Sequence, residues 1–154
     1  MSHASASPLT APAGVGGYPH AAPERPAMQR AGPAPAPGRP YVPWGMLAAI
    51  DLHGCESGRL ADRDAIRAFV RAVIDAIGMI AHGPLRLERF GEGELEGWSA
   101  MQFIETSSIT IHADEFSGRC FIDVFSCRPF DPDDAAAVAV THFGGMPTLR
   151  ILRR

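Results

Sequence analysis

Residues 98–127 read WSAMQFIETSSITIHADEFSGRCFIDVFSC and decide the fold. Apolar and polar residues alternate through three runs of this stretch, at 98–104, 107–112 and 121–127, which is the period-two pattern of half-buried β-strands. Short polar or glycine-containing segments separate the runs, so consecutive strands are expected to be joined as hairpins. The stretch therefore predicts an antiparallel sheet with one face packed on a core.

The clearest helix of the chain precedes this sheet. Asp62 or Asp64 can cap its N-terminus, and Gly78 is placed to end it. Its apolar residues are spaced at intervals of three and four, which puts them on one helix face: Ile66, Phe69, Val70, Val73, Ile74 and Ile77. A second helix is expected to begin at Pro132, after Asp131, and to run to Phe143.

Further strands are predicted at residues 46–52, 85–90 and 149–152, with a turn over 91–97. The resulting order of elements is β-α-β-β-β-β-α-β. Most of the strands follow one another as hairpins, and only two helices are inserted among them. We therefore expect an α+β fold, a two-layer sandwich with a mainly antiparallel sheet and two helices on one face.

Residues 1–43 have a different composition. They hold ten of the 14 prolines and show almost no apolar periodicity. Such a segment cannot bury enough apolar surface to offset the entropy of ordering it, so we expect a disordered Pro/Ala-rich tail. The tail has no basic start followed by an apolar stretch, so it does not read as a secretory signal. Residues 44–154 are expected to form the one folded domain.

The overall composition excludes several classes of protein. The chain is 46% hydrophobic with a formal charge of -3, and no apolar run is long enough to span a membrane. The mild acidity gives no support for nucleic-acid binding. Three irregularly spaced cysteines do not form a disulfide framework and fit a reducing, cytoplasmic compartment. His53 and Cys55 have no second pair at zinc-site spacing, so no metal site is expected.

All 14 basic residues are arginines, and the chain contains no lysine. Enzymes that use pyridoxal phosphate hold it as an imine on a lysine, so this class is excluded in its usual form.

The candidate chemistry lies in residues 105–112, followed by Cys127 fifteen residues after His112. By pattern alone these are two strands with a few polar positions. If the strands pair, a hydroxyl, an imidazole and a thiol could meet, which is the composition of a nucleophilic site. The residues alone leave both interpretations open.

The same residues carry a resemblance to a known family. The chain resembles the bacterial and archaeal S-adenosylmethionine decarboxylases, which have a serine, a histidine and a cysteine at fixed spacing. These three match, without gaps, Ser107, the Ile-His pair ending at His112, and Cys127 after Asp123-Val124-Phe125-Ser126. Ser99, in Gly-Trp-Ser, matches a family serine that assists processing. The Arg89-Phe90 pair and the Gly-Cys ending at Cys55 also match, so the resemblance covers roughly residues 45 to 153.

The resemblance implies a proenzyme that makes its own carbonyl cofactor. The chain would be cut between residues 106 and 107, and Ser107 would become a pyruvoyl group that forms a Schiff base with the substrate amine. His112 would be the base of processing, Ser99 its support, and Cys127 the proton donor to the decarboxylated substrate. This agrees with the missing lysine. The family also implies a homodimer with active sites shared between protomers.

The chain departs from the family pattern beside these residues. Thr106 and Ser108 stand where the family usually has glutamate and histidine, so Ser108 is a rival cleavage site. Residues 113–116, Ala-Asp-Glu-Phe, replace the family's Thr-Trp-Pro-Glu. Candidate substrate-binding residues are Asp51, Phe90, Glu115 and Phe116. Alternatively, these phenylalanines belong to the core and the acids are solvated.

The expected function is therefore pyruvoyl-dependent decarboxylation, with S-adenosylmethionine as substrate and spermidine synthesis as its role. One alternative changes the substrate to arginine or ornithine, and another is an unprocessed regulatory relative. An offset of five residues nominally puts Ser107 and His112 on opposite faces of a strand. Processing therefore requires a bulge or a strained turn near Ser107.

Overall fold

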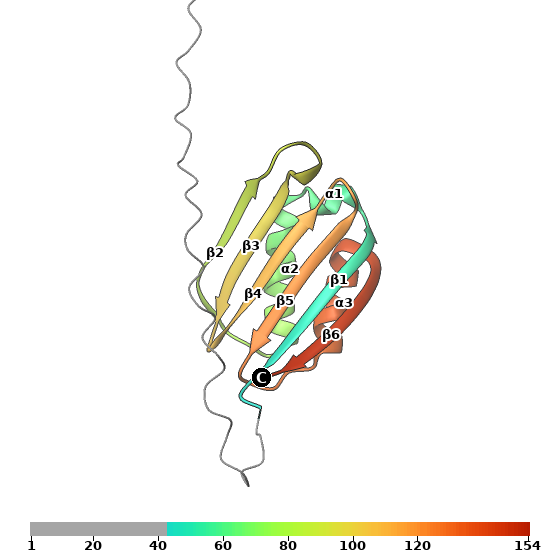
Figure 1. Cartoon of the computed structure of the whole chain (residues 1–154). Helices are drawn as coiled ribbons and strands as arrows, with labels where there is room; N and C mark the ends of the chain where they lie inside the picture. The colour runs from blue at the N-terminus through green and yellow to red at the C-terminus, as the bar shows by residue number, and fades with distance from the viewer. Residues whose placement is uncertain (1–42) are drawn as a thin grey trace, which may run out of the picture. The chain divides into compact units, whose positions relative to one another are not determined.

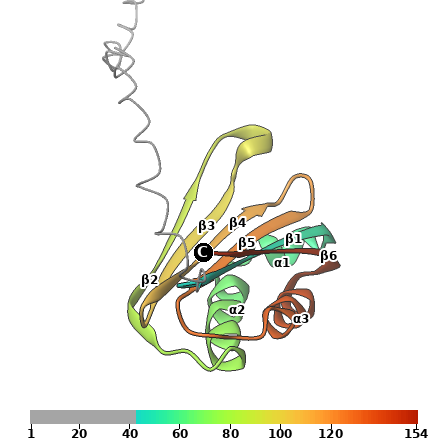
Figure 2. The ribbon, with the colours of Figure 1, turned by 60° about the horizontal axis from the view of Figure 1, so that its bottom comes forward.

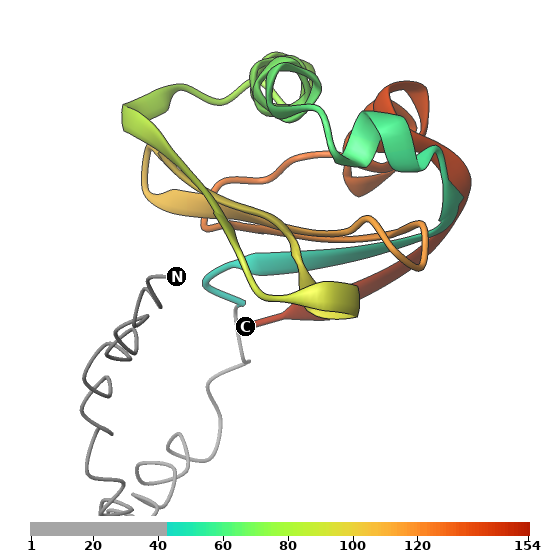
Figure 3. The same ribbon diagram turned by 90° about the horizontal axis from the view of Figure 1, so that it is seen from above.

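A computed structural model describes residues 43–154, which form one antiparallel sheet with helices on one of its faces (Figures 1 and 3). Except for residue 43, the predicted tail lies outside the described residues. The elements in chain order are β1 (Met46–Cys55), α1 (Ser57–Leu60), α2 (Arg63–Ala76), β2 (Ala81–Phe90), the 3-10 turn η1 (Gly93–Leu95), β3 (Gly97–Ile104), β4 (Ser107–Asp114), β5 (Arg119–Ser126), α3 (Pro132–Phe143) and β6 (Gly144–Arg153).

The strands lie in the order β2-β3-β4-β5-β1-β6, and all neighbouring strands are antiparallel. β2 to β5 form a meander, as the hairpin pattern predicts. β1, from the start of the described chain, lies between β5 and β6 (Figure 1). The α+β sandwich expected from the sequence is confirmed.

Both predicted helices form, and both begin at the predicted caps. The Asp62 carboxylate accepts a hydrogen bond from the backbone N–H of Asp64, 2.8 Å away, and Asp131 does the same for Asp133 at 2.9 Å. Gly78 follows α2 with a φ of +63°, the left-handed conformation that commonly ends a helix. Both helices cover the same face of the sheet (Figure 3).

The core lies between this face and the helices. Alternate residues of the four central strands are buried against the apolar faces of α2 and α3. The opposite face of the sheet is covered by no helix in residues 43–154, and we call it the open face (Figure 2). Register places the following residues on it: Ala49, Asp51, Ser99, Met101, Phe103, Ser108, Thr110, His112, Phe121, Asp123, Phe125 and Arg150. Among the helices of this part of the chain, none has the length and apolar character needed to cross a membrane.

The strands at the two edges are longer than the sequence pattern predicts. β2 begins at Ala81 and continues past Pro84, because a register shift between His82 and Arg86 accommodates the proline at the edge of the sheet. The buried side-chain amide of Gln102 bonds to the carbonyls of His82 and Gly83 and thereby holds this bulge. β6 begins directly at Gly144, so the predicted gap between the helix and the last strand is absent. The short helix α1 was not predicted.

Candidate active site

The turn between β3 and β4 is the strained point of the structure. It consists of Glu105 and Thr106, and Ile104 pairs with Ser107 across it. Thr106 has a φ of +65°, and among residues 43–154 it is the only residue other than glycine with a positive φ. A β-branched side chain in this region is a genuine outlier and costs of the order of 1–3 kcal/mol. The expectation of a strained turn near Ser107 is confirmed.

Ser107 and Cys127 lie together beside this turn. The Ser107 hydroxyl oxygen accepts a hydrogen bond from the backbone N–H of Cys127 at 3.1 Å. The Cys127 sulfur lies 2.8 Å from the hydroxyl oxygen of Thr106 and 3.5 Å from its carbonyl oxygen. That carbonyl belongs to the peptide bond before Ser107. The fold therefore brings the predicted nucleophile and the predicted thiol to the predicted cleavage point.

Cys127 is held in place by the buried end of β5. The hydroxyl of Ser126, which is fully buried, accepts a hydrogen bond from the backbone N–H of Arg128 at 2.9 Å and so fixes the bend that carries Cys127. Cys127 itself is half-buried. The other two thiols are buried, and burial raises the pKa of Cys55 and of Cys120, so neither is suited to proton transfer.

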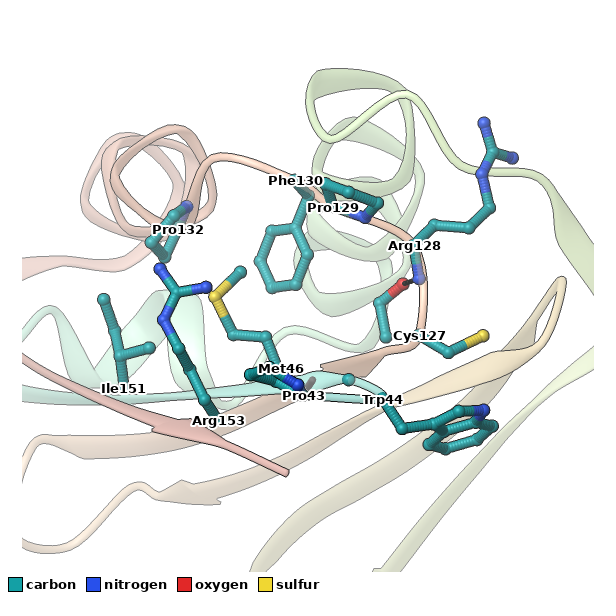
Figure 4. A pocket seen from close by; sticks show the side chains of 12 residues that line it. Pro43, Trp44, Met46, Cys127, Arg128, Pro129, Phe130, Pro132, Ile151 and Arg153 are labelled. Carbon is teal, nitrogen blue, oxygen red and sulfur yellow. Dashed lines mark hydrogen bonds between the residues drawn. The ribbon is translucent and has the colours of Figure 1, made fainter. Parts of the chain in front are cut away.

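A cavity of about 280 Å³ lies next to this cluster, on the side of the sheet that bears the helices. Apolar side chains of Met46, Phe130 and Ile151 line it together with Arg153, and no carboxylate among the described residues does. Figure 4 shows the Cys127 sulfur directed away from Phe130, and the sulfur contacts the hydroxyl of Thr106. Cys127 thus lies between this cavity and the turn before Ser107.

Ser99 and His112 form a second cluster, on the open face. They are direct partners on β3 and β4, and the Ser99 hydroxyl lies 2.9 Å from the His112 Nδ1. They line a cavity of about 200 Å³ with Phe90 and Phe121. The structure thus pairs the predicted processing histidine with its predicted supporting serine, and it puts the exposed ring of Phe90 beside them.

The two clusters do not meet within one chain. Ser107 and His112 are five residues apart on the regular strand β4, which corresponds to about 16 Å. Ser107 shares the parity of the buried residues Ile109 and Ile111, whereas His112 lies on the open face. The turn at Thr106 redirects the chain before Ser107 but does not bring Ser107 to His112.

Asp51, a predicted substrate-binding residue, is on the open face near the second cluster. Phe121 pairs with His112 on one side and with Asp51 on the other, so Asp51 is two strands away from His112. Its carboxylate forms an ion pair with Arg150 of β6. Asp51 therefore shares the open face with His112 but lies two strands away from it.

Glu115 and Phe116 lie apart from both clusters. Arg89 forms an ion pair with Glu115 and another with Glu96, and these hydrogen bonds raise the pKa of the guanidinium. Glu115 and Phe116 line a shallow cavity with Arg89 that contains neither Ser107 nor His112. Within one chain, Glu115 is therefore a structural partner of Arg89.

Two contributors to the site were not identified from the sequence. The Thr106 hydroxyl contacts the thiol of Cys127, and Ser126 anchors the bend before it. The only sequence feature that points to Ser126 is its hydroxyl group at a position of the strand where the alternation predicts a core residue. Thr106 was noted only as a departure from the family pattern. Within residues 43–154 no cluster of three or more histidine, cysteine or acidic side chains is arranged to hold a metal ion.

Comparisons with known proteins agree on one family. The model of the S-adenosylmethionine decarboxylase family matches residues 47–150. A curated S-adenosylmethionine decarboxylase proenzyme of Bacillus velezensis is 32% identical over 87 residues, which are 56% of this chain and 65% of that protein, so the chain spans less than two thirds of that relative. The crystal structure of the adenosylmethionine decarboxylase from Aquifex aeolicus has a similar fold, with a TM-score of 0.63 and 17% identity over 73% of this chain and 91% of that one. Since the family match extends over more than half of the sequence, including both clusters, this chain belongs to the S-adenosylmethionine decarboxylase family.

Proposed function

We propose that this chain is a self-processing, pyruvoyl-dependent decarboxylase of S-adenosylmethionine. The observation that carries the proposal is the geometry at residues 106–107. A peptide bond preceded by a strained residue has the Ser107 hydroxyl on one side and the Cys127 thiol 3.5 Å from its carbonyl oxygen. Family membership supports the same reaction. Decarboxylated S-adenosylmethionine would serve as the aminopropyl donor for spermidine, in the cytoplasm.

Cleavage follows from these groups in three balanced steps. The Ser107 hydroxyl oxygen adds to the Thr106 carbonyl carbon, the C–N bond breaks, and the amide nitrogen takes the hydroxyl proton, which leaves an ester. A base then removes the Ser107 α-proton, and the Cβ–O bond breaks with release of the Thr106 carboxylate. The enamine that remains becomes an imine, and water hydrolyses it to a pyruvoyl group with loss of ammonia.

The Thr106 turn favours the first step. Its left-handed backbone stores strain that is released when the peptide bond before Ser107 is broken. The thiol of Cys127 is close enough to the carbonyl oxygen to stabilise the negative charge that develops there. Once formed, the pyruvoyl group supplies the carbonyl that holds the substrate amine and accepts the electrons released with carbon dioxide. Cys127 would then return a proton to the substrate carbon.

A second copy of the chain supplies the base. Ser107 and His112 of one chain are about 16 Å apart along β4, so an intact site needs a Ser99–His112 pair from elsewhere. That pair lies on the open face, which also exposes apolar side chains of Met101 and Phe103. We therefore propose a homodimer that covers the open face and sets the pair of one protomer against Ser107 of the other.

The substrate-binding proposal rests on the open face. S-adenosylmethionine carries a sulfonium cation and an adenine ring, so its site needs acidic and aromatic groups. Asp51 and the exposed ring of Phe90 lie on the same side of the sheet as His112. The cavity beside Cys127 suits this cation poorly, because Arg153 lines it without a neighbouring carboxylate among the described residues.

Intact mass of the purified chain tests the proposal. We expect two chains, residues 1–106 and 107–154, the second lighter by one ammonia than a chain that starts with serine. Ser107→Ala should stay full length because no hydroxyl can form the ester. Ser108→Ala is the matched control and should still be cut. A single full-length chain after long incubation would contradict the proposal that the chain is an enzyme. The alternative of an unprocessed regulatory relative would then remain.

Carbon dioxide release from labelled amines tests the substrate. We expect release from S-adenosylmethionine by the processed enzyme and none from Ser107→Ala. Release of carbon dioxide from arginine or ornithine alone would contradict the assignment of S-adenosylmethionine as the substrate. The proposed mechanism of processing would still hold.

A further inference from the structure

We infer that a cavity at the β3–β4 turn is the subsite for the adenine ring of the substrate, and that Phe103 sets the specificity of the site by stacking on that ring. The cavity has a volume of about 430 Å³ and is lined by Ser107, the residue proposed to become the carbonyl. None of the three cavities described above is lined by Ser107. The inference rests on the proposed function for the identity of the ligand.

The cavity lies at the end of the sheet, where the start of β2 is beside the turn and residues of both faces meet (Figure 1). Ile104 and Ser107, which pair across the turn, have the parity of the buried residues. Phe103 and His82 are direct partners on β3 and β2 and belong to the open face. Because Phe103 precedes Ile104, its Cα is roughly 6 Å from that of Ser107. A ligand bound at residue 107 therefore reaches Phe103 within one cavity.

The ring of Phe103 is free to bind a ligand. The residue is 57% exposed, and within residues 43–154 no other aromatic ring packs against it. Its direct partner on β4 is Ser108, which has a small side chain. An exposed aromatic side chain in a cavity binds planar heteroaromatic rings by stacking. Phe103 is separate from Phe90, which lines the cavity that contains His112.

The wall that carries Phe103 is fixed from the buried side by the amide of Gln102. Its Nε2 lies 2.7 Å from the carbonyl oxygen of Phe103 and 3.2 Å from that of His82. These bonds join β3 to the bulge in β2, so the backbone of both cavity residues is held while their side chains stay exposed. A subsite that is formed before the ligand binds loses less entropy on binding.

Glu105 gives the cavity a negative charge. It is exposed and lines the cavity, and among residues 43–154 no arginine or histidine forms an ion pair with its carboxylate. Its backbone N–H donates to the carbonyl oxygen of Ile80 at 2.9 Å, so a cut after Thr106 leaves Glu105 anchored. An aromatic ring beside an unpaired carboxylate suits a ligand that joins an adenine ring to a sulfonium cation.

Binding of methylthioadenosine to an uncut chain tests the subsite directly. This compound has the adenine ring and the ribose of the substrate but neither its amine nor its positive charge. Full-length Ser107→Ala protein would be titrated with it by calorimetry, alone and with Phe103→Ala, Phe103→Tyr or Met101→Ala added. Met101 is the matched control, because it is exposed on the same face two positions away on β3 but does not line the cavity.

We expect Phe103→Ala to raise the dissociation constant about 5- to 50-fold. Phe103→Tyr keeps the ring, and it and Met101→Ala should leave the constant within about twofold. Equal affinities of the two alanine variants, or no binding to the uncut chain, would overturn the inference. Light scattering would be run on each variant. A Phe103→Ala chain that loses both affinity and dimerisation would assign the ring to the contact between copies and would also overturn it.

The second arm uses the fully cut enzyme and the charge of the substrate. Glu105→Gln should raise KM for S-adenosylmethionine about 3- to 5-fold at low ionic strength, with kcat unchanged, and added salt should reduce the difference. Inhibition by uncharged methylthioadenosine should be unchanged in Glu105→Gln and weakened in Phe103→Ala. A Glu105→Gln enzyme that binds both ligands equally weakly would overturn the role of the charge.

The two arms separate this inference from the proposed function. Because Ser107→Ala cannot be processed, the calorimetric arm gives a result without any catalysis. If the uncut chain binds methylthioadenosine through Phe103 but the unsubstituted chain releases no carbon dioxide from S-adenosylmethionine, the subsite is supported and the proposed function is wrong. If carbon dioxide is released but Phe103→Ala changes neither KM nor the binding of methylthioadenosine, the proposed function is supported and the subsite is wrong.

Discussion

The Ser99 hydroxyl lies 2.9 Å from the His112 Nδ1, on the open face of the sheet. Ser107, the residue on which this pair is expected to act, lies five positions along the same strand and has the opposite parity. The Ser99–His112 pair thus forms within one chain, but Ser107 of the same chain lies out of its reach. This arrangement makes a specific prediction about mixed dimers.

Co-expression of Ser107→Ala and His112→Ala chains should restore cleavage that neither variant shows alone. In a mixed dimer the Ser107→Ala chain offers an intact Ser99–His112 pair to the Ser107 of its partner. With equal expression and random pairing, up to about half of the His112→Ala chains should be cut. Mass spectrometry distinguishes the two chains. If the mixture remains uncut while dimers form, the base does not act across the interface.

Thr106→Gly should slow cleavage by removing backbone strain. Glycine adopts a φ of +65° without the steric cost that threonine bears there. Removing about 1–2 kcal/mol of strain corresponds to cleavage roughly 5- to 30-fold slower. Thr106→Ala is the control, since it also lacks the hydroxyl but keeps a Cβ. A glycine variant that is cut as fast as the alanine variant would show that the strain does not promote the reaction.

Asp51→Ala should reduce kcat/KM for S-adenosylmethionine about 10- to 100-fold, or about 1.4 to 2.7 kcal/mol, without preventing processing. The reason is loss of a carboxylate that balances the sulfonium or holds the ribose. Arg150→Ala is the matched control, because it breaks the same ion pair but leaves the carboxylate free. If both variants lose activity equally, Asp51 has only a structural role in the pair.

Alkylation of the three cysteines should occur in the order Cys127, Cys55, Cys120. Only the thiolate reacts, and burial raises the pKa of Cys55 and Cys120, so both stay protonated near pH 8. As the pH increases, Cys55 should react before Cys120, because Cys120 is more deeply buried and its pKa is raised further. Peptide mass mapping after short exposure gives the order. Early labelling of Cys120 would contradict the buried environment described for it.

The periodic elements could be predicted from the sequence because their pattern reflects burial. Alternation in residues 98–127 and the apolar stripe of α2 both arise from one face meeting the core, and the carboxylates of Asp62 and Asp131 are local caps. The edge strands were harder to predict. β2 contains Gly83 and Pro84, which normally interrupt a strand, and its bulge depends on the amide of Gln102 from the neighbouring strand.

The site was only partly predictable for a related reason. Ser107 and Cys127 are near each other because β4 and β5 pair, which the hairpin pattern implied. The ion pairs that engage Asp51 and Glu115 depend on Arg150 and Arg89, which lie far from them in the sequence. The contact of the Thr106 hydroxyl with Cys127 depends on a single backbone dihedral angle, and residue type alone does not specify it.

The position of β1 in the sheet has a consequence for the fate of a cut chain. A break before Ser107 would assign β1, β2 and β3 to one fragment and β4, β5 and β6 to the other. Since β1 lies between β5 and β6, the two fragments would be interleaved, with three strand-to-strand interfaces joining them: β3–β4, β5–β1 and β1–β6. Separation would require the loss of all three hydrogen-bonded ladders and of the shared core. The fragments should therefore persist as one folded unit without a covalent link, and refolding from separated pieces should be slow.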